Sequence, residues 1–278
     1  MNKSVCFVSP ITRQPLALSA DNSCYRTADG HESWPIIEGI PDFNQYDDSP
    51  FYGEVKEFGA AVLNGPNVEQ SLDAHRKRFE SQERWYAQII NTDGGLILEV
   101  AAGPGGGNVP AVLFDNPNAC VLMSDICLGV VLKWKRVLHA LCMGPNVSFA
   151  AFNAQRMPLA DCSIDTVSGV GGITEAGGEP TAQEVSRVLK PGGLLADMFM
   201  SLNEGELAKF PEEFRAKCGG RGSSYWEGFL EQLGFEIIKV EASYSRYFVP
   251  GESTLANEAA AYGLPLSFTD YMIIARKR

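Results

Sequence analysis

The feature that most constrains this chain is an apolar run that ends in a glycine-rich turn, residues 96–108. The run suits a buried parallel strand, and Glu99 stands near its end. Gly103 and Gly105 lack a Cβ, so we expect them to turn the chain with positive φ and to approach a bound molecule closely. Asn108 is then the predicted cap of a helix, which tolerates a proline in its first turn because the first amides have no internal partner. This order suits a nucleotide-like ligand, although plain tight connections share the same pattern.

Length and composition are typical of an ordinary globular protein. The 278 residues suffice for one large domain or for a main domain with a small appendage, and 45% are hydrophobic and 21% charged. The formal net charge of −11 means that the surface as a whole repels phosphate backbones, so nucleic acid is not an expected partner. We find neither a leader-like segment nor a stretch of membrane-spanning length, and we therefore expect a soluble cytoplasmic protein.

The seven cysteines are odd in number, scattered along the chain and mostly embedded in apolar segments. This pattern indicates reduced, buried thiols rather than a disulfide framework, which agrees with a cytoplasmic location. The seven positions are Cys6, Cys24, Cys120, Cys127, Cys142, Cys162 and Cys218.

Residues 1–45 are predicted to form a small β module of their own. Turn residues are frequent in this segment, and it lacks helical periodicity. The short runs 5–8 and 34–37 are typical of small strands, with Asp29-Gly30 as the turn of a hairpin.

The N-terminal segment also carries a recognisable set of positions. They are Cys6, the step Gln14-Pro15-Leu16, Cys24 and the run 34–41. On these residues the segment resembles the small zinc-ribbon-like module of the Trm112 type, which precedes the catalytic domain in some bacterial methyltransferases. Such modules bind zinc through paired cysteines, but Ser9 stands where a partner of Cys6 is expected, and Cys24 has no partner at the usual spacing. His31 does not complete a four-ligand site, so we predict a metal-free module.

Residues 46–95 are predicted to form a helical lid or linker. The stretch 71–90 is amphipathic, and its apolar face includes His75 and Tyr86. Aromatic side chains at helical spacing are typical of a core, and they also suit a surface that closes over a substrate.

From residue 96 onward, segments typical of strands and helices alternate, and we predict one domain over 96–278. Predicted strands span 119–124, 147–150, 164–170 and 194–200, with helices at 128–141 and 180–189. The second helix is predicted to end at residues 190–193, where Pro191 forbids its continuation and two glycines turn the chain. This alternation requires a parallel sheet with helices on both faces. Two late strands, 235–242 and 268–275, are joined by a stretch without helical pattern and predict an antiparallel hairpin at one edge.

Open α/β sheets bind ligands at the carboxyl ends of their strands, so residues there are the candidate site. Asp125, about twenty residues beyond the glycine loop, suits the two hydroxyls of a ribose. The side-chain oxygen of Asn153 suits an adenine amino group, and the Ala154 amide suits a ring nitrogen. Glu99 suits the amino group of an amino-acid tail, directly or through water. The predicted cofactor-binding residues are Glu99, Ala101, Ala102, Gly103, Gly105, Asp125, Ile126, Asn153, Ala154 and Gly169.

Two ligands compete for this arrangement. The dinucleotide fingerprint Gly-x-Gly-x-x-Gly fails, because Asn108 or Pro110 stands at the third glycine when the count begins at Gly103 or Gly105. The Gly-Lys-Ser/Thr of a phosphate loop is also missing. S-adenosylmethionine has no phosphate and needs only close backbone approach, an acid for the ribose and contacts for the adenine.

Several motifs of the main domain recur in one family. They are residues 99–108, Asp125, the run 153–159 with Asp161 and Asp165, and the run 184–193. On these residues the chain from 96 onward resembles the class I S-adenosylmethionine-dependent methyltransferases. The resemblance implies a Rossmann-like, seven-stranded, mostly parallel sheet with an antiparallel C-terminal strand. Ala101 stands where such proteins have a glycine, and Asn153 stands where they have an aspartate.

The resemblance implies in-line displacement at a sulfonium methyl. The protein then supplies proximity, alignment and exclusion of water, and a general base only for a protonated oxygen or nitrogen nucleophile. Candidate bases are His75, Tyr86 and Glu175. We expect a small-molecule acceptor. The alternatives are an RNA methyltransferase, which the N-terminal module favours, and a scaffold protein that binds the cofactor without transfer.

Overall fold

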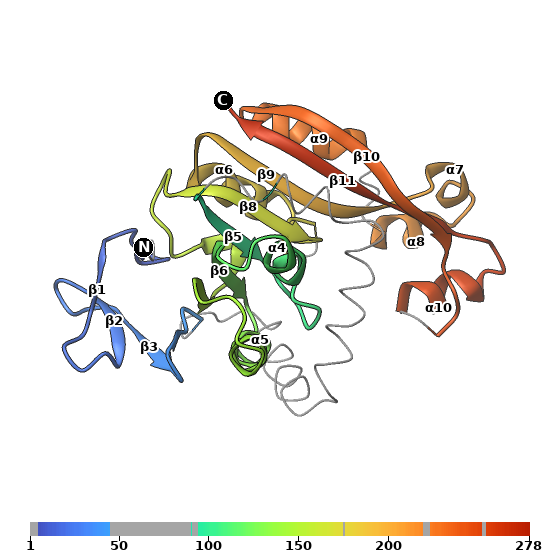
Figure 1. Cartoon of the computed structure of the whole chain (residues 1–278). Helices are drawn as coiled ribbons and strands as arrows, with labels where there is room; N and C mark the ends of the chain where they lie inside the picture. The colour runs from blue at the N-terminus through green and yellow to red at the C-terminus, as the bar shows by residue number, and fades with distance from the viewer. Residues whose placement is uncertain (1–4, 45–89, 91–93, 175, 219–222, 252–253) are drawn as a thin grey trace.

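The computed structural model describes residues 5–44, 90, 94–174, 176–218, 223–251 and 254–278, and these form two β-sheets (Figure 1). A small four-stranded sheet near the N-terminus precedes a larger seven-stranded sheet that helices flank. No helix within these ranges is long and apolar enough to cross a lipid bilayer. The predicted helical lid, residues 46–95, lies almost entirely outside the described ranges.

The larger sheet has the strand order β10-β11-β9-β8-β5-β6-β7. Strands β5 to β9 pair in parallel, whereas β11 pairs antiparallel with both β9 and β10. The strands are β5 (Leu96–Val100), β6 (Cys120–Asp125), β7 (Val147–Ala151), β8 (Ile164–Val170), β9 (Leu189–Leu202), β10 (Phe235–Tyr247) and β11 (Ser267–Lys277). The predicted α/β fold, with a mostly parallel sheet and an antiparallel C-terminal strand, is confirmed.

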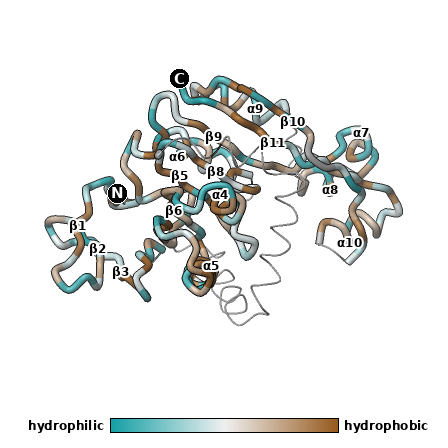
Figure 2. Tube along the Cα trace, in the orientation of Figure 1, coloured by the Kyte–Doolittle hydropathy of each residue, from teal (hydrophilic) through white to brown (hydrophobic). Residues whose placement is uncertain are grey.

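Helices cover both faces of this sheet, as predicted. The helices are α4 (Val109–Asp115), α5 (Leu128–Ala140), α6 (Glu179–Val188), α7 (Glu204–Leu207), α8 (Glu212–Lys217), α9 (Ser223–Gln232) and α10 (Thr254–Ala261). On the central strand β5, Ile97 packs in one hydrophobic cluster with α4 and α5, and Leu98 packs in another with α6 and α9. Neighbouring strand residues point to opposite faces, so β5 contributes to both cores. Figure 2 shows hydrophobic residues concentrated along the central strands and on α5.

The predicted antiparallel pairing of the two late strands at one edge of the sheet is confirmed, because β10 is the edge strand and pairs antiparallel with β11. The late part of the chain differs from the prediction in two other ways. The connection between β10 and β11 contains α10, where we predicted no helix. A helix of eight residues between Pro250 and Pro265 is too short for its periodicity to stand out in the sequence. Residues 190–193 also belong to β9 rather than to a turn before it.

The N-terminal sheet consists of four antiparallel strands in sequence order. They are β1 (Leu16–Leu18), β2 (Cys24–Thr27), β3 (Ser33–Ile37) and β4 (Ile40–Pro41). The predicted hairpin turn at Asp29-Gly30 is confirmed, and Gly30 has a φ of 73°. The predicted strand at 5–8 is wrong, because Phe7 and Val8 make only isolated bridges to Leu159 and Pro15. A strand requires a continuous partner, and here the two residues pair with different segments.

None of the seven cysteines, all of which lie within the described residues, forms a disulfide, but the structure corrects their predicted burial. Only Cys127 is buried, Cys6, Cys142 and Cys162 are exposed, and the other three are half-buried. Within the part of the chain that the structure describes, no three His, Cys, Asp or Glu side chains gather as a metal site would require. The resemblance of this module to the Trm112 type stays a prediction.

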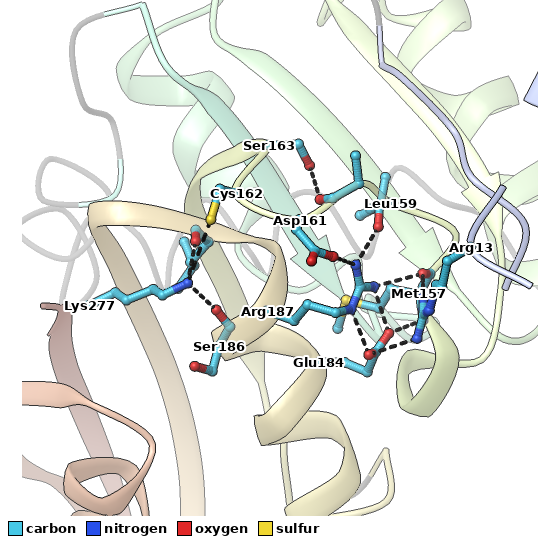
Figure 3. Close-up of polar contacts among 12 residues, drawn as sticks. Arg13, Met157, Leu159, Asp161, Cys162, Ser163, Glu184, Ser186, Arg187 and Lys277 are labelled. Atoms are coloured by element: carbon cyan, nitrogen blue, oxygen red, sulfur yellow. Dashed lines mark hydrogen bonds and ion pairs between the residues drawn. The ribbon is translucent and has the colours of Figure 1, made fainter. Parts of the chain in front are cut away.

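A hydrogen-bonded ion cluster joins the N-terminal segment to the main domain (Figure 3). The carboxylate of Glu184 on α6 accepts from Arg187 at 2.8 Å and from Arg13 at 2.9 Å. It also accepts from the backbone N–H of Met157 at 2.7 Å. Arg187 bonds on to the backbone carbonyls of Met157 and Leu159, so the cluster fixes the loop between β7 and β8. Glu184 and Arg187, two residues of the run 184–193, therefore have a structural role.

Glu184 makes the stability of this junction depend on pH. Burial alone would raise the pKa of Glu184, but the hydrogen bonds and charge of Arg187, together with the charge of Arg13, lower it below its ordinary value. A carboxyl group with a lowered pKa stabilises the fold above its unfolded pKa, and this contribution is lost as the pH falls through the folded pKa.

We predict that Glu184→Gln lowers the free energy of unfolding by about 1–3 kcal/mol at pH 7. The difference from wild type should shrink at and below the ordinary glutamate pKa of about 4.3. Urea denaturation of both proteins at pH 7 and at acid pH measures the difference. A gap that stays constant over this range would contradict the role of the Glu184 charge.

Candidate functional site

The candidate site lies where the chain reverses its direction of winding through the sheet. From β5 the chain adds β6 and β7 on one side and then crosses to β8 and β9 on the other. The carboxyl ends of β5 and β8 flank this switch point, which is the usual ligand site of an open α/β sheet. The backbone N–H of Ala102 donates to the Ser124 carbonyl at 2.9 Å, which ties the turn that follows β5 to β6.

Glu99 is buried and holds this turn in place. Its Oε1 accepts from the Asn108 backbone N–H at 3.0 Å, and its Oε2 accepts from the Ser168 hydroxyl at 2.6 Å. Only 1% of its surface is exposed. A buried carboxylate is tolerated when hydrogen bonds satisfy it, and the start of α4 favours a negative charge. Glu99 therefore links the start of α4 to β8.

The structure revises which residues of the loop need positive φ. Gly103 has a φ of 61°, as predicted, but Gly105 is not among the positive-φ residues. Gly106 and Gly107 take that conformation instead, with φ of 82° and 56°. A Cβ on Gly107 would lie 1.8 Å from Oε1 of Glu99, so this glycine leaves the room that the carboxylate occupies. The sequence motif showed a glycine run, but not which of its members faces Glu99.

Asn108 occupies the predicted cap position of α4 but does not cap the helix with its side chain. Its amide instead donates to the Ser168 hydroxyl at 2.9 Å and to the Gly169 carbonyl at 3.1 Å. The side chain points to β8 because polar partners lie there, and it is 1% exposed. The prediction that the Asn108 side chain caps α4 is therefore wrong, and this side chain instead joins the start of α4 to β8.

Asp125 ends β6 directly beside the glycine loop. Its Oδ2 accepts from Gly103 N–H and its Oδ1 from Cys127 N–H, both at 2.8 Å. Burial raises the pKa of Asp125, while these two backbone hydrogen bonds act in the opposite direction. A carboxylate has about four acceptor positions, so these two N–H groups leave capacity for further donors.

The segment after β7 places Asn153 and Ala154 at the carboxyl ends of the strands, where Asp125 also lies. Asn153 Oδ1 accepts from Gln155 N–H at 2.9 Å and caps the short 3-10 helix Ala154–Arg156. Ala154 is buried. Ile126, next to Asp125, is half-buried, and its backbone carbonyl accepts from Asn44 Nδ2 at 2.9 Å.

Two site-supporting residues were missed from the sequence. Asp197 on β9 is 2% exposed and accepts from the backbone N–H groups of Gly172 and Ile173, each at 3.1 Å. It thereby fixes the turn that follows β8, and a Cβ on Gly169 would lie 2.7 Å from its Oδ1. The sequence signal that could have found Asp197 is an acidic residue that stands alone within an apolar strand. No sequence signal pointed to Asn44.

The three candidate general bases are not placed by the structure. His75, Tyr86 and Glu175 lie outside the described residues, so their catalytic roles stay predictions.

Residues 99–196 match the family model of a methyltransferase domain. A ubiquinone/menaquinone biosynthesis C-methyltransferase from Hahella chejuensis is 30% identical over 105 residues, which is 37% of this chain and 41% of that protein. A demethylmenaquinone methyltransferase from Renibacterium salmoninarum is 31% identical over 119 residues, 40% of this chain and 46% of that protein. The alignments thus span less than half the length of these relatives.

The fold is similar to solved methyltransferase structures. A geranyl diphosphate C-methyltransferase from Streptomyces coelicolor, solved with Mg²⁺, geranyl diphosphate and S-adenosyl-L-homocysteine, matches with a TM-score of 0.59. The match covers 83% of this chain and 100% of that one at 13% identity. At this identity the similarity shows the Rossmann-like α/β fold.

We predict that Ala101→Gly stabilises the protein. Ala101 has a φ of 51°, a conformation that costs a residue with a Cβ about 1–2 kcal/mol. Replacement by glycine removes this strain. It also raises the conformational entropy of the unfolded chain, which offsets part of the gain in stability. We expect a net increase of about 0.5–1 kcal/mol in the free energy of unfolding, measured with urea. The control Ala102→Gly, at a buried residue without positive φ, should lower stability; equal effects would contradict the strain at Ala101.

We predict that Gly107→Ala is much more harmful than Gly103→Ala. Both positions have positive φ, which alone costs about 1–2 kcal/mol. At Gly103 the nearest atom to a new Cβ is 3.9 Å away, whereas at Gly107 it overlaps the Glu99 carboxylate. Displacing that carboxylate should bring the loss for Gly107→Ala to about 3–5 kcal/mol in urea denaturation. Similar losses for the two variants would show that Glu99 moves away without cost.

Proposed function

We propose that this protein is an S-adenosylmethionine-dependent methyltransferase that acts on a small molecule. The observation that carries this proposal is the carboxylate of Asp125, held at 2.8 Å from the Gly103 N–H where the glycine loop leaves β5. A ribose acid fixed against a backbone loop fits an adenosine ligand, and the matched methyltransferase domain, residues 99–196, contains both groups.

The residues at the carboxyl ends of the strands fit the successive parts of S-adenosylmethionine. Asp125 would accept from the ribose hydroxyls, Asn153 and Ala154 would contact the adenine, and Ile126 would pack beside it. The backbone of Ala101, Ala102, Gly103 and Gly105 would line the ligand, with Gly169 on the facing strand. Both oxygens of Glu99 already accept protein hydrogen bonds, so we propose that Glu99 reaches the ligand's amino group through water.

A dinucleotide is a poorer fit. The fingerprint needs a third glycine for close packing of helix and strand, and Asn108 fills that position with a buried side chain bonded to β8. No phosphate is needed for the ligand that we propose, so this side chain does not conflict with it.

The chain's own contribution to the reaction is binding and orientation. When bound, S-adenosylmethionine supplies an electrophilic methyl group to a nucleophile in line with its sulfur. Glu99, Asp125 and Asp197 hold the surrounding turns through backbone hydrogen bonds and so preorganise the site. A general base is needed only for a protonated oxygen or nitrogen, and His75, Tyr86 and Glu175 remain its proposed sources.

The proposed acceptor is a small molecule rather than nucleic acid. The relatives are named as a ubiquinone/menaquinone biosynthesis C-methyltransferase and a demethylmenaquinone methyltransferase, and the similar solved structure holds geranyl diphosphate. The net charge of −11 also disfavours a phosphate backbone. Quinols and prenyl diphosphates are therefore the first acceptors to test with methyl-labelled donor. Methylation of RNA, or cofactor binding without any transfer, would favour the two alternatives.

We predict that Asp125→Ala abolishes cofactor binding. Isothermal titration with S-adenosylhomocysteine should show binding by wild type and a loss of at least about 100-fold in the variant, because charged hydrogen bonds to the hydroxyls disappear. The control is Asp161→Asn, at a carboxylate whose side chain is 74% exposed and pairs with Arg187. The control should bind as wild type does. Failure of wild type to bind would refute the proposed function.

A further inference from the structure

Asn44 connects the N-terminal segment to the turn that follows β6. Its Nδ2 donates to the backbone carbonyl of Ile126 at 2.9 Å, and Ile126 directly follows Asp125. Asn44 is 1% exposed, so this hydrogen bond is shielded from water. The contact joins residues that are far apart in the sequence and belong to different predicted modules.

The N-terminal segment holds Asn44 firmly on its other side. Asp42 Oδ1 accepts from both the backbone N–H and the Nδ2 of Asn44, each at 3.1 Å. Asp42 forms a parallel bridge with Ala151, and Phe43 N–H donates to the Ala151 carbonyl at 2.8 Å. These two contacts hold residues 42–44 beside the end of β7 and place Asn44 against the turn between β6 and α5.

The packing around this segment makes the placement rigid. Phe43 lies in an aromatic group with Phe7, Tyr25 and Trp34, with ring centroids 5.0 to 6.3 Å apart. Ile40 is fully buried in a cluster with Val131 of α5 and Ala151 of β7. The small N-terminal sheet is therefore anchored to the main domain on the side where the turn after β6 lies.

The side-chain Oδ1 of Asn44 is buried, and no donor among the residues that the structure describes reaches it. Buried polar atoms almost always have a hydrogen-bond partner, so this acceptor has capacity for one further donor. The ribose hydroxyls and the amino group of an adenosine are donors of the required kind.

We propose that Asn44 is a positioning residue of the cofactor site, which fixes the Ile126 carbonyl and thereby the turn that presents Asp125. This inference rests on the proposed function and extends it. The N-terminal segment becomes part of the adenosine end of the site rather than a separate appendage. The chain therefore needs its N-terminal segment for full affinity toward the cofactor.

The test is isothermal titration of the full chain with S-adenosylhomocysteine. We expect Asn44→Ala to raise Kd about tenfold, which corresponds to about 1.4 kcal/mol. Asn44→Asp has nearly the same size but loses the donor to Ile126, so it should also bind more weakly. The matched control is Arg13→Gln, which breaks the junction of the same segment with α6. The control should lose stability in urea and keep the wild-type Kd.

A second ligand separates positioning from general damage. The loss in Asn44→Ala should be of similar size for S-adenosylhomocysteine and for 5′-methylthioadenosine, because both contain the adenosine that Asp125 holds. A loss confined to S-adenosylhomocysteine would place the defect at the amino-acid end and overturn the proposal. A folded Asn44→Ala protein with wild-type Kd would overturn it as well. Absence of binding by wild type would refute the proposed function, and this inference with it.

Discussion

The contact between the Glu99 carboxylate and the start of α4 underlies the geometry of the site. Glu99 bonds the Asn108 N–H and the Ser168 hydroxyl at once, and Gly107 leaves room for it. The Glu99 carboxylate is almost fully shielded from water, so a charge there is tolerated only while its hydrogen-bond donors stay in place. The turn after β5 therefore has little freedom to move unless Glu99 loses its partners.

Other carboxylates around the sheet also accept hydrogen bonds from backbone N–H groups. Asp125 bonds the backbone of the glycine loop, and Asp197 bonds the turn after β8. At the opposite end of β5, Asp165 accepts from the Leu96 N–H at 2.8 Å and from Lys190 at 2.6 Å. Carboxylates hold backbone N–H groups strongly because the acceptor is charged. The turns after β5 and β8 are thus each fixed by a carboxylate on an adjacent strand.

The sequence predicted the strands and helices well where their patterns were long, and less well where a partner decided the outcome. The buried run of β5 and the acid at the end of β6 followed from hydrophobic patterning and spacing. Positive φ was predicted at Gly105 rather than at Gly106 and Gly107, because a run of glycines does not reveal which φ each of them adopts. Asn108 was expected to cap α4, but β8 offers it better partners. The helix α10 was too short to detect, and the insertion of β11 depends on pairing between distant strands.

The sequence by itself determined the α/β class, the glycine-rich turn after a buried strand and the acid at the end of the next one, because local periodicity and spacing carry that information. Only the tertiary structure decided how the parts of the site are fixed. The bonds of Glu99 to β8, of Asp197 to the turn after β8 and of Asn44 to Ile126 all join residues distant in sequence. Such contacts leave no periodic signal, since they form only when packing brings the strands and the N-terminal segment together.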